Sequence, residues 1–287
     1  MLLLLVVSFG SCKKEDKPSP EPQPTNSFTQ KVLIEKFTTT SCGNCGKADL
    51  DIEWYKNHYQ QKLISVHYHL PTGQFGGDKM ATQHGTQIAS AFDVRATPYA
   101  AINRSHIPND SNTIVYPGGN WGTPIDNQIK MFAQCGIAID ASKISGDEMQ
   151  VEATVSFSKT QNEPMYITVL LLEDSVTGDT GYWQANYYNQ DPNVPELYGR
   201  GHPIKNYVHN DVYRQAISPF WGQLIPSEFT AINTTHTVNL TTNIAAYNQR
   251  HLKVVAFVHG QGTVFTKHKH KILNAQIVRA GQKQPLD

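Results

Sequence analysis

The first half of the chain alternates short apolar runs with longer amphipathic stretches, a pattern typical of strands followed by helices. The expected strands span 31–38, 63–70 and 98–104, and the expected helices span 44–60, 78–92 and 123–134. Alternating strands and helices indicate a partly parallel sheet covered on both faces. We therefore expect an α/β domain over residues 30–135.

From Gly136 onward the hydrophobic pattern changes to a period of two, which indicates strands. Strand-like runs span 150–157, 166–173, 207–217, 236–240, 252–259, 263–268 and 272–278. Several short strands with turn residues between them predict an all-β, immunoglobulin-like sandwich domain over residues 136–287. The 287 residues are enough for two domains, each with its own core.

An apolar run at residues 1–10 precedes Ser11 and Cys12. It is far too short to span a bilayer and is typical of a secretion signal. We expect residues 1–12 to be a lipoprotein signal that ends at a lipidated Cys12; a plain signal with an incidental Cys12 is the alternative. The charged, proline-rich residues 13–29 would form a semi-rigid tether, so that only the lipid anchor contacts the membrane.

The segment Cys42-Gly43-Asn44-Cys45 lies where the first expected strand turns into the first expected helix. Two cysteines at this spacing lie about one helical turn apart and can form a disulfide. The partial positive charge of a helix N-terminus favours the thiolate, so Cys42 would attack and Cys45 would resolve. A permanently oxidised clip is one alternative. Half of a zinc site is the other, although zinc needs further ligands.

A Thr97-Pro98 pair before the third expected strand makes this half of the chain resemble the thioredoxin superfamily. The resemblance implies a cis Pro98 against the dithiol and a Thr97 whose backbone binds the partner. It also implies a buried acid beneath the dithiol. Glu35 would fill that position and transfer a proton, if one extra residue is allowed in the turn; an ordinary charge at a strand edge is the alternative.

Charge and the remaining polar side chains narrow the function classes. Lys and Arg number 24, as do Asp and Glu, so the net charge is zero and gives no electrostatic case for nucleic acid. His67 and His69 share one strand face and, with His84, offer a metal site as the alternative to a polar face. We expect no metal and no cofactor. Cys135 is either buried or paired between chains.

A long aromatic and polar insertion follows Gly178 and ends near Trp221. Its tyrosines, tryptophan and arginine are residue types that dominate contact surfaces. The alternative is a loop folded over one sheet, with its aromatic side chains filling a minor core.

The mature chain as a whole resembles the bacterial surface lipoproteins related to the 28-kilodalton outer membrane protein. The features that carry this resemblance are Cys12, the run at 32–38 before the Cys42–Cys45 segment, the stretch at 206–210, and Leu273-Asn274-Ala275 in the tail. It implies a thioredoxin-like domain followed by a β-sandwich, anchored at the outer membrane or cell surface, with a periplasmic orientation as a further option. Two functions follow as hypotheses: thiol-disulfide exchange with envelope or surface proteins, or a non-catalytic binding protein or adhesin with a structural disulfide.

Overall fold

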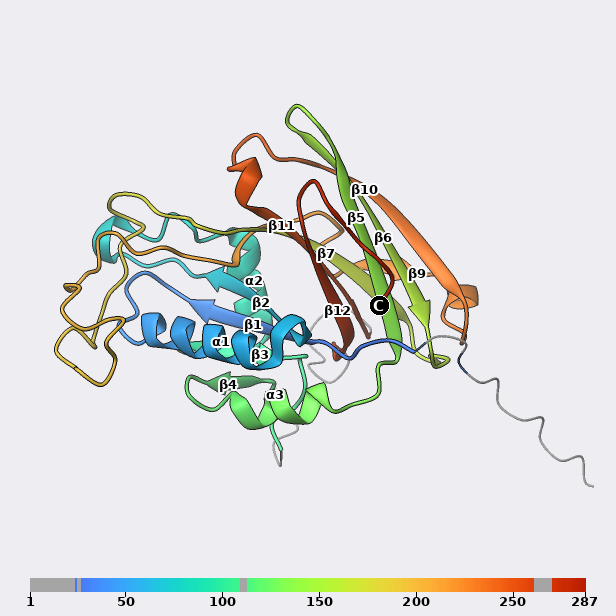
Figure 1. Ribbon diagram of the computed structural model, residues 1–287, viewed down its shortest axis with the longest axis horizontal. Helices are drawn as coiled ribbons and strands as arrows, with labels where there is room; N and C mark the ends of the chain where they lie inside the picture. Colours follow the sequence, from blue (N-terminus) through green and yellow to red (C-terminus); the bar gives the residue numbers. More distant parts are fainter. Residues whose placement is uncertain (1–23, 25–26, 109–112, 261–269) are drawn as a thin grey trace, which may run out of the picture.

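The computed structural model describes residues 24, 27–108, 113–260 and 270–287. The expectations for Cys12, for most of the tether and for a strand at 263–268 fall outside these residues. Within them the chain is mostly β, with two sheets and three α-helices (Figure 1).

A large mixed sheet forms the centre of the molecule. Its strands are β1 (Val32–Thr38), β2 (Leu63–His69), β3 (Tyr99–Ile102), β4 (Val115–Pro117), β7 (Met165–Glu173), β8 (Val212–Ala216), β9 (Gln223–Ile225), β11 (Leu252–His259) and β12 (Ile272–Arg279). Their order is β12-β11-β7-β8-β2-β1-β3-β4, with β9 beside β7. The strand β1 is parallel to β2, as the crossover through α1 requires, and antiparallel to β3.

This sheet continues across the boundary that we expected between residues 135 and 136. The strand β8 of the second half pairs with β2 of the first half, at His67 and Val212. The His67 amide also donates to the Asp211 carbonyl at 2.8 Å. The two halves of the chain therefore share one hydrogen-bonded sheet rather than meeting only through a linker.

The second sheet is antiparallel and packs on the β7, β11 and β12 part of the first. It contains β5 (Cys135–Ser145), β6 (Glu148–Phe157), β10 (Thr235–Asn243) and β13 (Lys283–Gln284), in the order β10-β6-β5-β13. Val151, Ala153, Val155 and Phe157 of β6 all enter the core between the sheets. The predicted period of two is thus confirmed, because alternate residues of a strand share one face.

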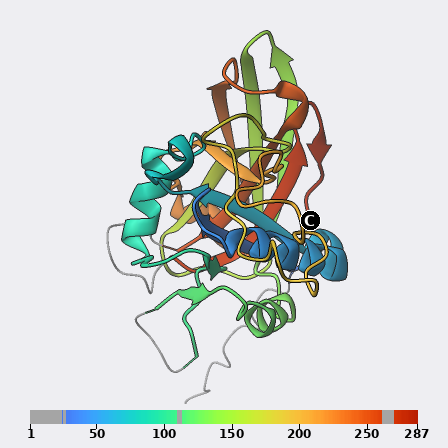
Figure 2. The same cartoon turned by 90° about the vertical axis from the view of Figure 1, so that its left-hand side faces the viewer.

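Helices cover both faces of the other end of the large sheet. They are α1 (Cys45–Tyr59), α2 (Gln83–Ala91) and α3 (Gly122–Ile129). The helices α1 and α3 share a core with Val32 and Ile34, whereas α2 packs against Leu33 and Phe37 on the opposite face (Figures 1 and 2). Short 3₁₀ turns occur at Gln60–Lys62, Gln74–Gly76, Ser227–Phe229 and Gln249–His251.

Several element ends differ from the sequence prediction for local reasons. The helix α2 begins at Gln83 rather than at 78 because the Thr82 side chain caps it, accepting from the Gly85 amide at 2.9 Å. The strand β3 ends at Ile102 because Asn103 and Arg104 have φ of 45° and 49°, in the left-handed region. The strand expected at 207–217 is shorter, since residues 207–211 precede β8.

The end of the expected tether is bound to the fold. A Cβ atom at Gly136 would lie 2.3 Å from the Phe28 ring, so Phe28 rests directly on β5. The Thr29 amide donates to the Asp287 carboxylate at 2.8 Å, and Lys31 pairs with the same carboxylate at 3.0 Å. Any free tether must therefore end before Phe28.

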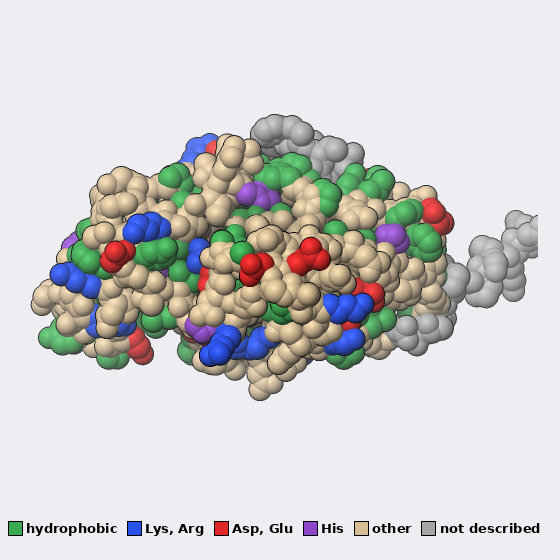
Figure 3. All heavy atoms as spheres, turned by 90° about the horizontal axis from the view of Figure 1, so that it is seen from above, with side chains coloured by type: hydrophobic (Ala, Val, Ile, Leu, Met, Phe, Trp, Pro, Cys, Tyr) green, Lys and Arg blue, Asp and Glu red, His purple; other side chains and the backbone are tan. Residues whose placement is uncertain are grey.

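The surface carries both signs of charge. On the face shown in Figure 3, basic and acidic side chains are interspersed rather than gathered into one patch. Among the helices that the structure describes, none is long and apolar enough to cross a membrane.

Candidate functional site

Cys42 and Cys45 form a disulfide at the beginning of α1, with Cα atoms 5.3 Å apart. The turn is held by its own backbone, because the Cys42 amide donates to the Thr39 carbonyl at 3.0 Å and the Cys45 amide to the Cys42 carbonyl at 3.1 Å. Cys45 is fully buried and Cys42 is 9% exposed. Both sulfurs lie at the positive end of the α1 dipole, an environment that favours a thiolate once the bond is reduced.

The Thr97–Pro98 peptide bond is cis and lies beside the beginning of α1. Thr97 and Pro98 line a pocket of about 470 Å³ together with Asn44 of the Cys-x-x-Cys turn and Tyr188. The Gly118 amide donates to the Pro98 carbonyl at 2.9 Å, which fixes the opposite wall. The fold thus brings together the two segments that the sequence analysis singled out.

A long segment between β7 and β8, residues 178–211, lies over the disulfide; we call it the cap. The Ala185 amide donates to the Thr40 carbonyl at 2.8 Å and the Tyr187 amide to the Gly43 carbonyl at 3.0 Å. The Gln184 side chain donates to the Cys42 carbonyl at 2.8 Å. These bonds seat the cap on the backbone of the Cys-x-x-Cys turn.

Gly43 is required for this close approach. A Cβ atom at position 43 would lie 2.3 Å from the Tyr187 ring, well inside van der Waals contact. A glycine lets a second backbone come this near. The dipeptide between the two cysteines therefore matches the cap as well as the helix start.

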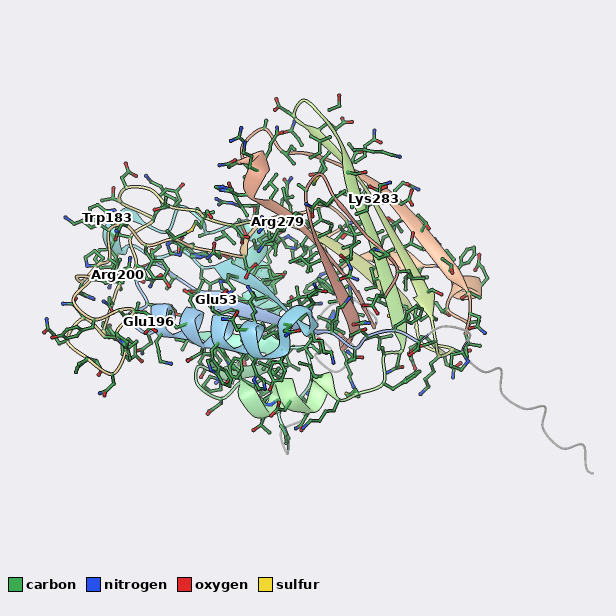
Figure 4. All side chains as sticks on the ribbon, in the orientation of Figure 1. Glu53, Trp183, Glu196, Arg200, Arg279 and Lys283 are labelled. Carbon is green, nitrogen blue, oxygen red and sulfur yellow. A yellow bond between two sulfur atoms is a disulfide. The ribbon has the colours of Figure 1, made fainter. Side chains whose placement is uncertain are left out.

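The cap has a small apolar core of its own, which sits against α1. Val194, Leu197, Ile204 and Tyr207 form it, with Leu50 of α1 packed beside them. The segment therefore has a minor core of its own, but this core packs on α1 and contains no residue of a sheet strand. Two tyrosines remain largely exposed, Tyr187 at 68% and Tyr198 at 50%. Figure 4 shows Trp183, Glu196 and Arg200 on the cap, at the end of the molecule where α1 begins.

Glu35 does not occupy the position that the thioredoxin resemblance suggested. Its side chain is fully buried on the α2 face of β1, so it is not a charge at a strand edge either. Both carboxylate oxygens accept from Arg104, at 2.7 Å each, and Tyr68 donates to one of them at 3.2 Å. A carboxylate held in this way serves as the partner of a buried ion pair rather than as a proton donor beneath the dithiol.

The charged residue on the α1 face of β1 is Lys36, which the sequence analysis missed. It is buried and pairs with Asp49 of α1, which also accepts from Tyr207 of the cap at 2.8 Å. Asp49 follows Cys45 by one helical turn, so the two share a helix face. The period of two was the available signal, since it places Lys36 with Val32 and Ile34 on the face opposite Glu35.

The Lys36–Asp49 pair predicts a specific acid sensitivity. Burial acts to raise the pKa of Asp49, but Lys36 and His67 outweigh it and lower the pKa from 3.8 to about 2. Because the pKa of Asp49 is lower in the folded state than in the unfolded state, ionised Asp49 stabilises the fold by about 2 kcal/mol above pH 4. This contribution to the free energy of unfolding is lost as the pH falls towards 2. Urea unfolding of wild type and Asp49→Asn should show a stability difference that shrinks by this amount between pH 6 and pH 2.5. A difference that stays constant would contradict the assignment.

The three histidines proposed as metal ligands do not converge. His67 lies by Asp49, and burial together with Lys36 holds its pKa well below the ordinary value. The His69 Nδ1 atom lies 2.8 Å from Asp78, whereas His84 contacts Tyr213 and Phe220 on the other side of the sheet. Over the described ranges there is no group of three or more His, Cys, Asp or Glu residues arranged to hold a metal ion.

Cys135 is a free thiol at the first position of β5 and is fully buried in the core of the sandwich. Burial raises the pKa of this thiol. It therefore behaves as a small apolar side chain, and pairing with another chain would require the sandwich to open.

Comparisons with known proteins identify a matching family and similar folds. The sequence profile of the family described as outer membrane protein Omp28 matches residues 85–283. Among solved structures, HBP35 of Porphyromonas gingivalis is similar with a TM-score of 0.68 and 16% identity, covering 91% of this chain and 78% of that one. Protein AGR_C_4864 from Agrobacterium tumefaciens has a TM-score of 0.58 and 14% identity, covering 91% and 99%. No curated protein sequence matches the chain.

Proposed function

Because the chain belongs to the Omp28 family of outer membrane proteins, we propose that it exchanges disulfides with protein partners at the outer membrane or cell surface. In this proposal residues 30–135 act as a thioredoxin-like unit, and the strands that follow form an immunoglobulin-like sandwich that supports it. Cys12 carries a lipid anchor, which keeps the folded part at the membrane without direct contact.

One observation carries this proposal: the Cys42–Cys45 disulfide lies at a helix N-terminus whose neighbouring pocket is lined by the cis Thr97–Pro98 pair. The pocket gives a partner chain a place beside the Cys-x-x-Cys turn, whose Asn44 contributes to its lining. The helix dipole stabilises the thiolate that forms when the disulfide opens. Cys42 is the sulfur that reacts with the partner because Cys45 is fully enclosed.

The exchange starts from the oxidised pair seen in the structure. A partner thiolate attacks the Cys42 sulfur; a bond forms between these two sulfurs, and the Cys42–Cys45 bond breaks to release the Cys45 thiolate. A second thiolate of the partner then attacks the partner's own sulfur in this mixed disulfide and releases the Cys42 thiolate. The partner ends as a disulfide, and this chain ends as a dithiol after its two thiolates take up the protons lost by the partner. Run in reverse, the same steps reduce a partner.

The second candidate function is a surface binding protein with a static disulfide. It is favoured by the low exposure of Cys42 and by the three hydrogen bonds that tie the cap to the Cys-x-x-Cys turn. In that case the cap supplies the contact surface, and the disulfide stiffens the turn beneath it.

An exchange assay on the full chain tests the proposal. Wild type should reduce a test protein disulfide or oxidise a test protein dithiol, Cys42→Ser should fall to the uncatalysed rate, and Cys135→Ala should retain activity because its thiol is outside the site. Equal rates for wild type and Cys42→Ser would end the enzyme proposal.

A redox titration of the Cys42–Cys45 pair separates the two candidates independently. A potential above about −300 mV indicates an exchanging disulfide, and a lower potential indicates a structural one.

A further inference from the structure

We propose that the partner is an extended, uncharged polypeptide segment, with an aromatic or large apolar side chain four to five residues from its reacting cysteine. The segment would lie in a groove that runs along α1, from the disulfide to a second and larger pocket. This inference rests on the proposed function, since it defines which proteins the Cys42–Cys45 pair would accept.

The groove joins two pockets that meet at Gly119. The first is the pocket beside Pro98 and Asn44, and the second has a volume of about 600 Å³ and lies between α1, the end of β3, and α3. Gly119 lines both pockets. Residues between β4 and α3 contribute to the lining of both pockets, and so do residues of α1. Figure 1 shows α1, β4 and α3 at the same end of the molecule.

The α1 wall is one continuous stripe of the helix. Lys47 and Asp51 line the first pocket and Tyr55 lines the second. These residues are spaced four apart, so they project from the same face of the helix. The far wall approaches closely at Gly122, where a Cβ atom would lie 3.0 Å from the Tyr55 hydroxyl oxygen.

The lining determines the chemistry of the occupant. Among the described residues that line the two pockets, the fully charged side chains are Lys47 and Asp51, and these pair with each other. The larger pocket combines flat apolar surfaces with side-chain amides; its lining includes Tyr55, Tyr116, Pro117, Pro124, Asn127 and Gln128. Aromatic and apolar walls accept an aromatic or apolar side chain, while the amides can bond to peptide groups on either side of it.

The length of the groove sets the spacing within the partner. From Asn44 to Tyr55 the helix rises by roughly 16 Å, at 1.5 Å per residue. An extended chain covers this distance in about five residues, at 3.3 Å per residue. A partner cysteine at the Cys42 sulfur therefore places the fourth or fifth neighbouring side chain in the larger pocket.

The test mixes the reduced protein with a panel of otherwise neutral peptides, each with one cysteine joined by a disulfide to a small thiol. A single phenylalanine is moved from six residues before this cysteine to six residues after it. Wild type should show a maximum in exchange rate at four to five residues on one side of the cysteine. Asn127→Trp should remove that maximum, because Asn127 is an exposed α3 residue that lines the larger pocket. The matched control is Lys130→Trp, an exposed position just after α3 and outside the lining.

A small aromatic disulfide serves as the second substrate because it does not extend into the groove. Its rate should be equal in wild type, Asn127→Trp and Lys130→Trp. If the exchange rate does not depend on the position of the phenylalanine but the small disulfide is turned over, the groove proposal is wrong and the proposed function stands. No turnover of any disulfide would overturn the proposed function. In that event, the fluorescence anisotropy of a labelled peptide with serine in place of cysteine tests the groove without any exchange reaction. Binding that is weaker in Asn127→Trp but not in Lys130→Trp supports the groove, and equal binding by all three proteins contradicts it.

Discussion

Replacing Arg104 with methionine is expected to lower the free energy of unfolding by about 3–5 kcal/mol, because it leaves the Glu35 carboxylate buried without its partner. Arg104 and Glu35 are 3% and 0% exposed, and two bonds of 2.7 Å join them. The guanidinium carbon also lies 5.1 Å from the centre of the Phe92 ring and 4.9 Å from that of Phe257. Chemical denaturation with urea measures the effect.

The control is a double substitution, Glu35→Leu with Arg104→Met. It removes both charges and keeps an apolar filling, so most of the lost stability should return. A single Arg104→Met variant within about 1 kcal/mol of wild type would show that the pair contributes little.

Arg104 also connects the two halves of the chain, since Phe92 follows α2 and Phe257 lies in β11. We therefore expect wild type to unfold in one transition rather than two.

Replacing Gln184 with alanine is expected to speed reduction of the Cys42–Cys45 disulfide by about 5-fold to 30-fold. Gln184 is 1% exposed, and its amide donates to the Cys42 carbonyl at 2.8 Å. Losing a buried hydrogen bond costs about 1–2 kcal/mol, and each 1.4 kcal/mol changes the population of an opened cap tenfold. Thiol labelling after mixing with dithiothreitol gives the rate.

A second cap variant, Asn193→Ala, provides the comparison. Asn193 is exposed and its side-chain amide bonds to Asp191, so its loss should leave the rate unchanged. If Gln184→Ala and wild type are reduced at the same rate, then the reductant reaches Cys42 without movement of the cap. A cap that limits access would explain how the Cys42–Cys45 pair is shielded from non-specific thiols while the groove beside Pro98 stays open.

Many helices and strands of this protein could be predicted from the sequence because each depends on residues that are close together along the chain. The run before Cys42 formed β1, and in β2 the period of two places Ile64, Val66 and Tyr68 in one core, on the face opposite His67 and His69. The two stretches singled out for chemistry, at Cys42–Cys45 and Thr97–Pro98, also lie in one place. Hydrophobic periodicity and turn-forming residues act over a few positions, so both can be recognised directly in a sequence.

What the sequence by itself determined was therefore the three helices, most of the strands but not β4, β5, β9 and β13, and a cysteine spacing at the start of α1 that allows a disulfide. Only the tertiary structure decided that β2 pairs with β8, that Glu35 binds Arg104 while Lys36 binds Asp49, and that the cap covers Cys42. The residues Gln184 and Cys42 are 142 positions apart, and Arg104 is 69 from Glu35. Contacts at such separations depend on how the sheet is assembled, and no local pattern of hydrophobic and polar positions specifies that assembly.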